Sequence, residues 1–214
     1  MNGTQLDSSS DLGFIHRFVP PKSNSKATLL VLHGTGGNED DLLSMANMID
    51  DQAAILSPRG KVLENGMPRF FRRLEEGVFD IEDLKFRTNE LADFVNKASR
   101  RYGFDSKSVI AVGYSNGANI AASMLLLRPE SLKGAILFRA MIPLQPERMP
   151  VLSGKRIFVS AGRYDTLIPR DKTRELVGFL EKAGANVTMN WEDSTHSLAA
   201  GELEKAKNWL KEVD

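Results

Sequence analysis

Ser115 stands in the pattern G-x-S-x-G, within the segment Gly113–Gly117. The strand-forming residues Ser108–Val112 precede this pattern, and the apolar stretch Ala118–Leu127, typical of a buried helix, follows it. A strand, a sharp turn and a helix in this order present the serine hydroxyl at a helix N-terminus, and the two glycines leave room for the turn to close. Unpaired N–H groups at that end favour developing negative charge. The pattern therefore predicts that Ser115 is the nucleophile of a hydrolase.

A serine nucleophile requires a general base, and His196 is the candidate. It is the one histidine downstream of Ser115, and it lies between the last predicted strand and the last predicted helix. That position places an imidazole over the sheet edge where the serine is expected. We therefore predict that His196 takes the proton from Ser115 and later gives it to the leaving group. The alternative is a solvated loop histidine without a catalytic role.

The base in turn requires an orienting carboxylate, which we predict to be Asp165. Asp165 follows the strand Arg156–Ser160 at its carboxyl end, and the resulting chain order is serine, acid, histidine. Glu192 and Asp193 are rivals, but a residue three positions before the histidine does not easily turn back to hold it. Asp171 fits instead the first turn of the next helix, where the helix dipole favours a carboxylate.

Two backbone N–H groups are needed to hold a tetrahedral oxyanion. We predict that one comes from Asn116, directly after the nucleophile, and the other from Thr35 in the glycine-rich loop 33–38, with Gly36 as the second choice. The loop lacks the Lys-Ser/Thr pair of a P-loop and the spacing G-x-G-x-x-G, so it does not predict a nucleotide site.

The other two histidines are expected to be structural. His33 ends a buried strand just before Gly34, so we expect its ring to lock the glycine-rich loop by hydrogen bonding, with direct catalysis as the lesser alternative. His16 lies on the first strand, remote in sequence from the other candidates, and we expect it on the surface.

Short apolar, β-branched runs separated by helical patterns supply the elements that position these residues. Their alternation predicts a mostly parallel sheet with helices on both faces, a three-layer α/β/α sandwich. About seven strands are expected, at Phe14–Val19, Thr28–Leu32, Ala53–Leu56, Ser108–Val112, Gly134–Phe138, Arg156–Ser160 and Val187–Trp191. We expect the first strand to run antiparallel to the second because Pro20–Asn24 is typical of a tight reversal.

Apolar residues at helical spacing predict three helices besides the one after Ser115. Their apolar faces comprise Leu91, Phe94, Val95, Ala98 and Tyr102; then Leu176, Phe179, Leu180 and Ala183; and finally Ala199, Leu203, Ala206, Leu210 and Val213. Neither an internal repeat nor a linker interrupts the pattern. It therefore predicts a single domain over residues 1–214, with residues 1–12 as a flexible N-terminal segment.

Two connections are longer than usual and follow strands, so both should lie at the carboxyl edge of the sheet, where open α/β folds bind ligands. They run from Pro58 to about Leu84 and from Arg139 to Pro150. We expect them to form the walls of a pocket or, alternatively, to pack as outer core. The apolar residues concerned are Phe70, Phe71, Phe79, Met141 and Ile142.

The first of these connections also carries Arg69, Arg72 and Arg73. These arginines either attract an acidic substrate or are solvated and paired with Glu75 and Glu76. The second interpretation is the one we favour, because charge runs in loops are commonly solvated.

Lys plus Arg and Asp plus Glu number 28 each among the 214 residues, so the formal net charge is zero. This balance gives no electrostatic reason to expect nucleic acid or an anionic membrane as a partner. The absence of cysteine excludes disulfides, thiolate catalysis and zinc–sulfur sites. The polar N-terminus lacks the profile of a signal peptide, and no apolar run approaches the roughly 20 residues that span a bilayer. We therefore expect a cytoplasmic protein.

Four motifs together resemble the phospholipase/carboxylesterase family of small α/β-hydrolases. They are His33–Gly37, Gly113–Gly117, Gly162–Asp165 and Thr195-His196, and the resemblance extends from Phe14 to Leu210. It implies an α/β-hydrolase fold without a large cap domain, a Ser115–Asp165–His196 triad and hydrolysis of carboxylic esters or thioesters. The resemblance further implies that no metal or organic cofactor is required, and it is compatible with a homodimer.

Within that family, the segment 67–80 is most similar to a bacterial branch of general carboxylesterases and hydrolases of aromatic compounds. The thioesterase branch commonly has Leu-Gly-Asp after His-Gly, whereas this chain has Thr35-Gly36-Gly37. We therefore expect a small to medium carboxylic ester as the small-molecule substrate. Thioesterase, lysophospholipase-type or aromatic-metabolite hydrolysis on the same triad is the alternative, and a non-catalytic binding protein is a remote one.

Overall fold

The computed structural model describes residues 5–7, 12–22, 25 and 27–212. Its centre is a sheet of eight strands in the order β1-β2-β4-β3-β9-β10-β11-β12. The pairs from β4 to β12 are parallel, and the pairs β1–β2 and β2–β4 are antiparallel. The strands are β1 (Gln5–Asp7), β2 (His16–Val19), β3 (Thr28–Leu32), β4 (Ala54–Pro58), β9 (Val109–Tyr114), β10 (Gly134–Phe138), β11 (Arg156–Gly162) and β12 (Asn186–Glu192).

All seven predicted strands are confirmed, with ends that differ by at most two residues. The eighth, β1, lies within the segment expected to be flexible and pairs with β2; residues 1–4 and 8–11 lie outside the described part of the chain. The first predicted strand, β2, does run in the opposite direction to β3. However, β4 lies between the two, because β2 pairs with β4 through Phe18 and Leu56.

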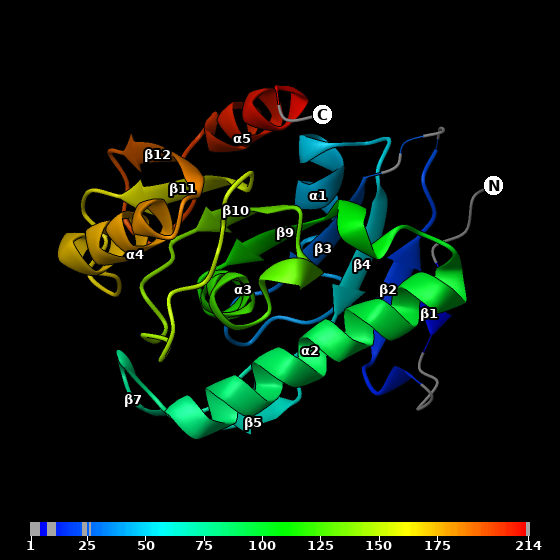
Figure 1. Cartoon of the computed structure of the whole chain (residues 1–214), viewed down its shortest axis with the longest axis horizontal. Helices are drawn as coiled ribbons and strands as arrows, with labels where there is room; N and C mark the ends of the chain where they lie inside the picture. Colours follow the sequence, from blue (N-terminus) through cyan, green and yellow to red (C-terminus); the bar gives the residue numbers. More distant parts are fainter. Residues whose placement is uncertain (1–4, 8–11, 23–24, 26, 213–214) are drawn as a thin grey trace.

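In the described part of the chain, five α-helices cover the two faces of the sheet (Figure 1). On one face lie α2 (Ile81–Tyr102), α3 (Asn116–Leu127) and α4 (Arg170–Lys182), and on the other lie α1 (Leu43–Ile49) and α5 (Glu202–Lys211). The sequence did not predict α1, which has only seven residues and no side-chain cap at its N-terminus. Single turns of 3₁₀-helix occur at Ser106–Ser108 and Pro129–Ser131. The three-layer α/β/α prediction is confirmed.

The central strands are buried on both faces, as parallel strands between two layers of helices must be. Along β3, Leu30 and Leu32 pack with the residues of α2, α3 and α4, whereas Leu29 and Val31 pack with those of α1 and α5. The alternation follows from the period of two of a strand. The loops that leave the carboxyl edge of the sheet therefore start from strands that are packed on both faces.

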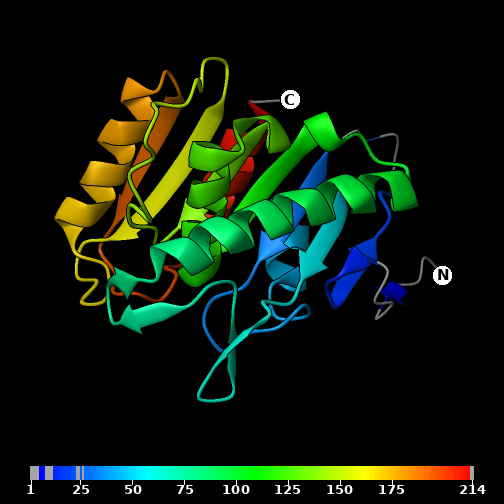
Figure 2. The same ribbon diagram turned by 60° about the horizontal axis from the view of Figure 1, so that its bottom comes forward.

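The long connection after β4 is not a loop but two small hairpins, β5 (Val62–Glu64) with β6 (Met67–Arg69) and β7 (Arg73–Glu75) with β8 (Val78–Phe79). Both hairpins lie beyond the carboxyl edge of the sheet (Figure 2). The second long connection, residues 139–150, contains neither a helix nor a strand, as expected. Within the described residues, therefore, two short hairpins and no large cap domain follow β4.

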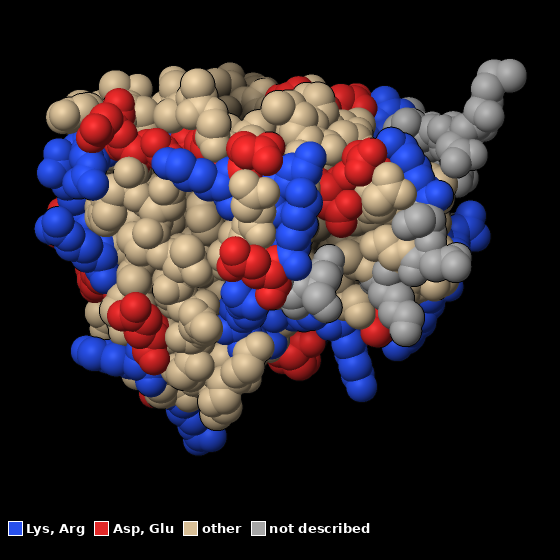
Figure 3. All heavy atoms as spheres, turned by 90° about the horizontal axis from the view of Figure 1, so that it is seen from above, with Lys and Arg blue, Asp and Glu red and all other residues tan. Residues whose placement is uncertain are grey.

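Basic and acidic side chains are interspersed on the face of the molecule seen in Figure 3, in keeping with the balanced charge of the sequence. None of the helices in the described residues combines the length and the apolar character that a bilayer-spanning helix needs.

Candidate active site

The turn between β9 and α3 holds Ser115 in a backbone conformation that L-residues rarely adopt, with φ 52° and ψ −114°. The N–H of Ser115 donates to the carbonyl of Phe138 at 2.9 Å, which fixes the turn to the neighbouring strand β10. A Cβ atom on Gly113 would lie 2.6 Å from Cα of Ala118, and one on Gly117 would lie 2.0 Å from the carbonyl oxygen of Leu32. The turn therefore has the strained geometry that its glycines predicted.

We expect Gly117→Ala to destabilise the fold, because the added methyl group meets backbone atoms that cannot move without displacing β3. Overpacking of this kind costs about 1–3 kcal/mol. Gly178→Ala in α4 is the matched control, since no atom lies within 4 Å of the added Cβ, and there alanine should stabilise the helix by about 0.5–1 kcal/mol. Urea unfolding of both variants measures the difference; equal free energies of unfolding would contradict the prediction.

The structure brings the three predicted triad residues together. Nε2 of His196 lies 3.0 Å from Oγ of Ser115, and Nδ1 of His196 lies 2.8 Å from Oδ2 of Asp165. The other carboxylate oxygen of Asp165 accepts the N–H groups of Leu167 and Ile168 at 2.8 and 3.0 Å. Since an ionised carboxylate only accepts, Nδ1 carries the proton of a neutral ring and Nε2 is left to accept from the serine.

The rival carboxylates are engaged elsewhere. Asp193 is exposed and pairs with Arg163 at 3.1 Å, and Glu192 pairs with Lys205 at 2.6 Å. Asp171 lies in the first turn of α4, as predicted. Asp165, by contrast, has only 1% of its side chain exposed, and its Oδ2 contacts the imidazole of His196.

The loop after β3 passes beside the serine. The N–H of Gly36 already donates to the carbonyl of Pro68 at 2.9 Å, and that of Gly37 to the carbonyl of Gly34 at 3.1 Å. These bonds remove the second choice for the oxyanion hole and leave Thr35 as the candidate on this loop. Asn116, the other candidate, begins α3, where the first N–H groups of a helix have no partner within the helix.

Arg69 of the first hairpin and Phe70, which follows it, hold the residues of these two backbone donors in place. Oγ1 of Thr35 accepts Nη1 of Arg69 at 2.8 Å, and Oδ1 of Asn116 accepts the N–H of Phe70 at 2.8 Å. Neither contact involves the N–H groups proposed for the oxyanion. The hairpin thus fixes the glycine-rich loop and the start of α3 relative to each other.

The expectation for His33 is confirmed and that for His16 is wrong. Nε2 of His33 accepts the N–H of Gly60 at 2.9 Å, and burial lowers the pKa of His33, so the neutral ring locks the loop. His16 is fully buried rather than at the surface, with one ring nitrogen 2.7 Å from the hydroxyl of Tyr102 and the other 2.7 Å from the carbonyl of Phe14. Helix α2 packs on β2 and covers His16, and the residue pattern of the strand alone does not predict this long-range contact.

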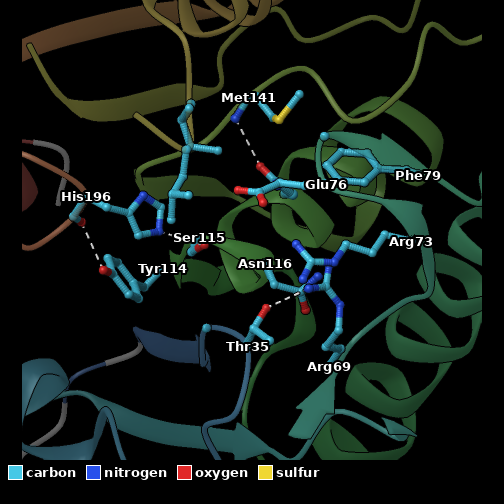
Figure 4. Close-up of a pocket in the computed structure, with 15 residues that line it drawn as sticks. Thr35, Arg69, Arg73, Glu76, Phe79, Tyr114, Ser115, Asn116, Met141 and His196 are labelled. Carbon is cyan, nitrogen blue, oxygen red and sulfur yellow. Dashed lines mark hydrogen bonds between the residues drawn. The ribbon is translucent and has the colours of Figure 1, made fainter. Parts of the chain in front are cut away.

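Above the serine lies a cavity of about 480 Å³ (Figure 4). Its lining residues come from the loop after β3, both hairpins, the elbow, and the segments after β10, β11 and β12. They are Gly34, Thr35, Arg69, Arg73, Glu76, Gly77, Phe79, Tyr114, Ser115, Asn116, Asn119, Met141, Leu167, Ile168 and His196.

Of the five predicted pocket residues, Phe79 and Met141 line the cavity and three do not. Phe70 is buried against the ring of His33, with 4.7 Å between the ring centroids. Phe71 is fully buried and packs edge-on against Phe79, and Ile142 packs against the same core. The prediction is therefore wrong for Phe70, Phe71 and Ile142, because all three pack with the main hydrophobic core instead of lining the cavity.

Leu167 and Ile168 supply apolar lining that the sequence analysis missed, although their position just after Asp165 was a usable signal. Tyr114 was also missed: its hydroxyl donates to the carbonyl of His196 at 2.9 Å, and burial raises its pKa. This bond ties the histidine loop to the elbow. Tyr114, the first variable residue of G-x-S-x-G, thus has a structural role here.

The three arginines of the first connection are not paired with Glu75 and Glu76, which corrects that prediction. Arg69 is buried, with 3% of its surface exposed, and Arg72 pairs with Asp80 at 2.9 Å. Arg73 pairs with Glu64 at 2.8 Å, and Nε of Arg69 lies 3.2 Å from the same carboxylate. The turn of the first hairpin brings Glu64 next to both arginines, so this contact could be predicted only by first predicting the hairpin.

A buried ion pair supports the loop that carries His196. The guanidinium of Arg139 binds both carboxylate oxygens of Glu202, at 2.6 and 3.0 Å, and both side chains are fully buried. Arg139 also donates to the carbonyls of Thr195 and Ser197, at 3.1 and 2.6 Å, and these residues flank the histidine. Sequence reasoning placed Arg139 only as the start of a loop, and no local pattern links it to Glu202.

A serine on a strained turn after one strand, an acid after another and a histidine after the last, at one edge of a parallel sheet, define the α/β-hydrolase fold. The model of the family described as Phospholipase/Carboxylesterase matches residues 15–214. The chain therefore belongs to the phospholipase/carboxylesterase family, as the four motifs indicated.

Three relatives place the chain within the family. It is 50% identical to "Putative hydrolase MhqD" of Bacillus subtilis (strain 168), over 92% of this chain and 98% of that protein. It is 51% identical to the Bacillus cereus carboxylesterase, whose crystal structure superposes with a TM-score of 0.93 over 96% of this chain and 97% of the other. The acyl-protein thioesterase 1 of Candida albicans (strain SC5314) is more distant, at 23% identity over 89% of this chain and 94% of that protein.

Proposed function

We propose that this protein is a serine carboxylesterase that hydrolyses small to medium carboxylic esters through an acyl-enzyme on Ser115. The observation that carries the proposal is the continuous hydrogen-bonded chain from Asp165 through His196 to Ser115, with the serine facing a cavity. The similarity to the carboxylesterase of Bacillus cereus supports the same class of reaction.

The reaction begins when His196 accepts the Ser115 proton on Nε2 and the serine oxygen attacks the ester carbonyl. The N–H groups of Thr35 and Asn116 stabilise the oxyanion of the tetrahedral intermediate. The imidazolium, stabilised by Asp165, then gives its proton to the leaving alcohol, and the acyl group remains on the serine oxygen. Water repeats the sequence with His196 as base, and the carboxylic acid leaves.

The cavity favours small to medium esters over long acyl chains. Its volume of about 480 Å³ lies toward the lower end of the range typical of small-molecule sites, about 300–1,000 Å³. Phe79, Met141, Leu167 and Ile168 supply an apolar wall for the acyl or the alcohol part. Thioester hydrolysis would use the same triad, and no feature of this cavity favours it.

The test is labelling by a fluorophosphonate, which reacts only with an activated serine, followed by kinetics on matched esters and thioesters. We expect the label on the peptide that contains Ser115, and higher kcat/KM for 4-nitrophenyl acetate and butyrate than for the corresponding thioesters. Failure of both labelling and ester hydrolysis would show that the triad is not active, and faster thioester hydrolysis would reassign the reaction.

A further inference from the structure

The end of the cavity away from His196 is built from two arginines. Figure 4 shows the guanidinium groups of Arg69 and Arg73 next to each other there, with Asn116 beside them. Arg69 belongs to β6 and Arg73 to β7, so the two hairpins meet at this point. An esterase that took only apolar esters would have no need of a buried guanidinium group, that of Arg69, and a partly exposed one, that of Arg73, beside its substrate.

One carboxylate serves both arginines. Glu64 lies 2.8 Å from Nη2 of Arg73 and 3.2 Å from Nε of Arg69, and it is not among the residues that line the cavity. Two positive charges thus share one negative charge behind the cavity wall. The pKa of Arg69 is lowered, first by burial and then by the charge of Arg73, which is the expected result of incomplete compensation.

Donors at this end also remain without acceptors. Nη1 of Arg69 donates to Thr35 and its Nε to the carbonyl of Phe71, whereas its Nη2 has no hydrogen bond to any described residue. The side-chain nitrogen of Asn116, which is 2% exposed, likewise lacks an acceptor within the described part of the chain. The side-chain nitrogen of Asn116 is thus a buried donor without a partner, which is uncommon in folded proteins and calls for a ligand or another acceptor.

Glu76 is the one acidic residue of the cavity lining, and it differs from Glu64 in place and exposure. It lies in the exposed turn between β7 and β8, and within the described residues it makes no ion pair with Arg69 or Arg73. Its charge faces the cavity from the rim. It opposes the entry of an anion but does not neutralise the arginines.

From these contacts we infer that the ester bound in this cavity carries a carboxylate, which the guanidinium groups of Arg69 and Arg73 hold while Ser115 attacks the ester carbonyl. The inference rests on the proposed esterase function and specifies its substrate class. Planar guanidinium groups match a carboxylate through paired charge-assisted hydrogen bonds, which are stronger than neutral ones. The apolar residues Phe79, Met141, Leu167 and Ile168 then contact the part of the substrate between the two groups.

The test compares esters that differ only in this charge. One pair carries it in the acyl part, 4-nitrophenyl glutarate against 4-nitrophenyl glutaramate, and the other in the leaving group, 4-acetoxybenzoate against 4-acetoxybenzamide. We expect the carboxylate to be preferred in kcat/KM by about 10-fold in at least one pair, which also shows on which side of the scissile bond the arginines lie. Equal kcat/KM values in both pairs, with active enzyme, would overturn the inference while leaving the esterase function intact.

Two charge-removing variants, Arg73→Gln and Glu76→Gln, should have opposite effects and show whether the cavity arginines cause the preference. Arg73→Gln should lower the ratio of carboxylate to carboxamide by about 10-fold, and Arg73→Lys should restore part of it. Glu76→Gln, at the exposed turn, should raise the same ratio by about threefold, because only a screened repulsion is removed. The ratio cancels any common effect of a variant on catalysis. A ratio that neither variant moves would contradict the assignment.

A binding measurement keeps the inference testable if no ester is hydrolysed. Titration calorimetry with glutarate, and with glutaramide as the neutral control, should show binding of the dianion to the unmodified protein and weaker binding to Arg73→Gln. Binding without hydrolysis would refute the esterase proposal and support the anion site. If glutarate did not bind and no carboxylate ester was preferred, the anion site would be refuted.

Discussion

Replacing Ser115 with alanine is expected to lower kcat/KM for 4-nitrophenyl acetate by on the order of 10⁴-fold or more. Oγ is the atom that His196 contacts at 3.0 Å, and the variant leaves the oxyanion donors without a nucleophile beside them. Alanine keeps the Cβ atom, so the strained backbone conformation at φ 52° costs the same in both proteins, and the variant tests the loss of Oγ alone. Steady-state kinetics with the purified variant measures the loss, and loss of the acyl-enzyme burst accompanies it.

Ser197→Ala is the matched control for this variant, because Ser197 lies next to His196 but its hydroxyl has no place in the triad. We expect its kcat/KM to stay within about twofold of the unmodified protein, since substitutions at exposed positions have small effects. The double variant Ser115→Ala, His196→Ala should lose little more than Ser115→Ala alone, because residues that act as a unit are not additive. A Ser115→Ala protein that kept full activity would refute the triad.

The arrangement of the triad could be predicted because each member follows its own strand. Ser115 comes directly after β9, and Asp165 and His196 lie in the loops that leave β11 and β12; the parallel register of these strands brings their ends to one edge. Hydrophobic runs of four to six residues were sufficient to locate the strands, since both faces of a parallel sheet are buried. Local pattern and sheet topology therefore carried the prediction of the fold and of the contacts among the three residues.

The hairpins over the site were within reach of the sequence but were not predicted. Asn65 and Gly66 have φ angles of 51° and 80°, and Asn-Gly with two positive φ angles is the strongest short signal for a two-residue hairpin turn. Without that turn, Glu64 cannot be placed against Arg69 and Arg73. The same omission explains why Phe70 and Phe71, which connect the two hairpins, were assigned to the pocket instead of to the hydrophobic core.

Other features depend on contacts between distant segments and have no local signal. The burial of His16 depends on Tyr102 and Phe94 of α2, which lie about 80 residues further along the chain. The pairing of Arg139 with Glu202 spans 63 residues and requires a non-glycine residue at φ 58°. Residue spacing predicts neither contact, because the partners come together only when the sheet and its helices have assembled.

That ion pair leads to the second large effect: Glu202→Gln is expected to lower the free energy of unfolding by about 3–5 kcal/mol. The substitution leaves the guanidinium of Arg139 buried without a counter-charge, at a position with no exposed surface. Urea unfolding measures the loss. Lys205→Gln is the control on the same helix: Lys205 pairs with Glu192 at 2.6 Å but is half exposed, so its loss should cost at most about 1 kcal/mol. Equal losses of unfolding free energy in the two variants would show that the buried pair contributes no more to stability than the exposed one.

A double variant separates stability from the positioning of the histidine. Replacing a buried ion pair with apolar residues of similar size often restores stability, so Arg139→Met, Glu202→Leu should recover much of the free energy of unfolding. It cannot restore the donors to the carbonyls of Thr195 and Ser197, which hold the loop of His196 beside Ser115. Since small displacements of a catalytic group cost about 100-fold, we expect kcat to remain about 10- to 100-fold low in the stable double variant, with KM little changed. A double variant as active as the unmodified protein would show that Tyr114, through its bond to the carbonyl of His196, suffices to hold the base in place.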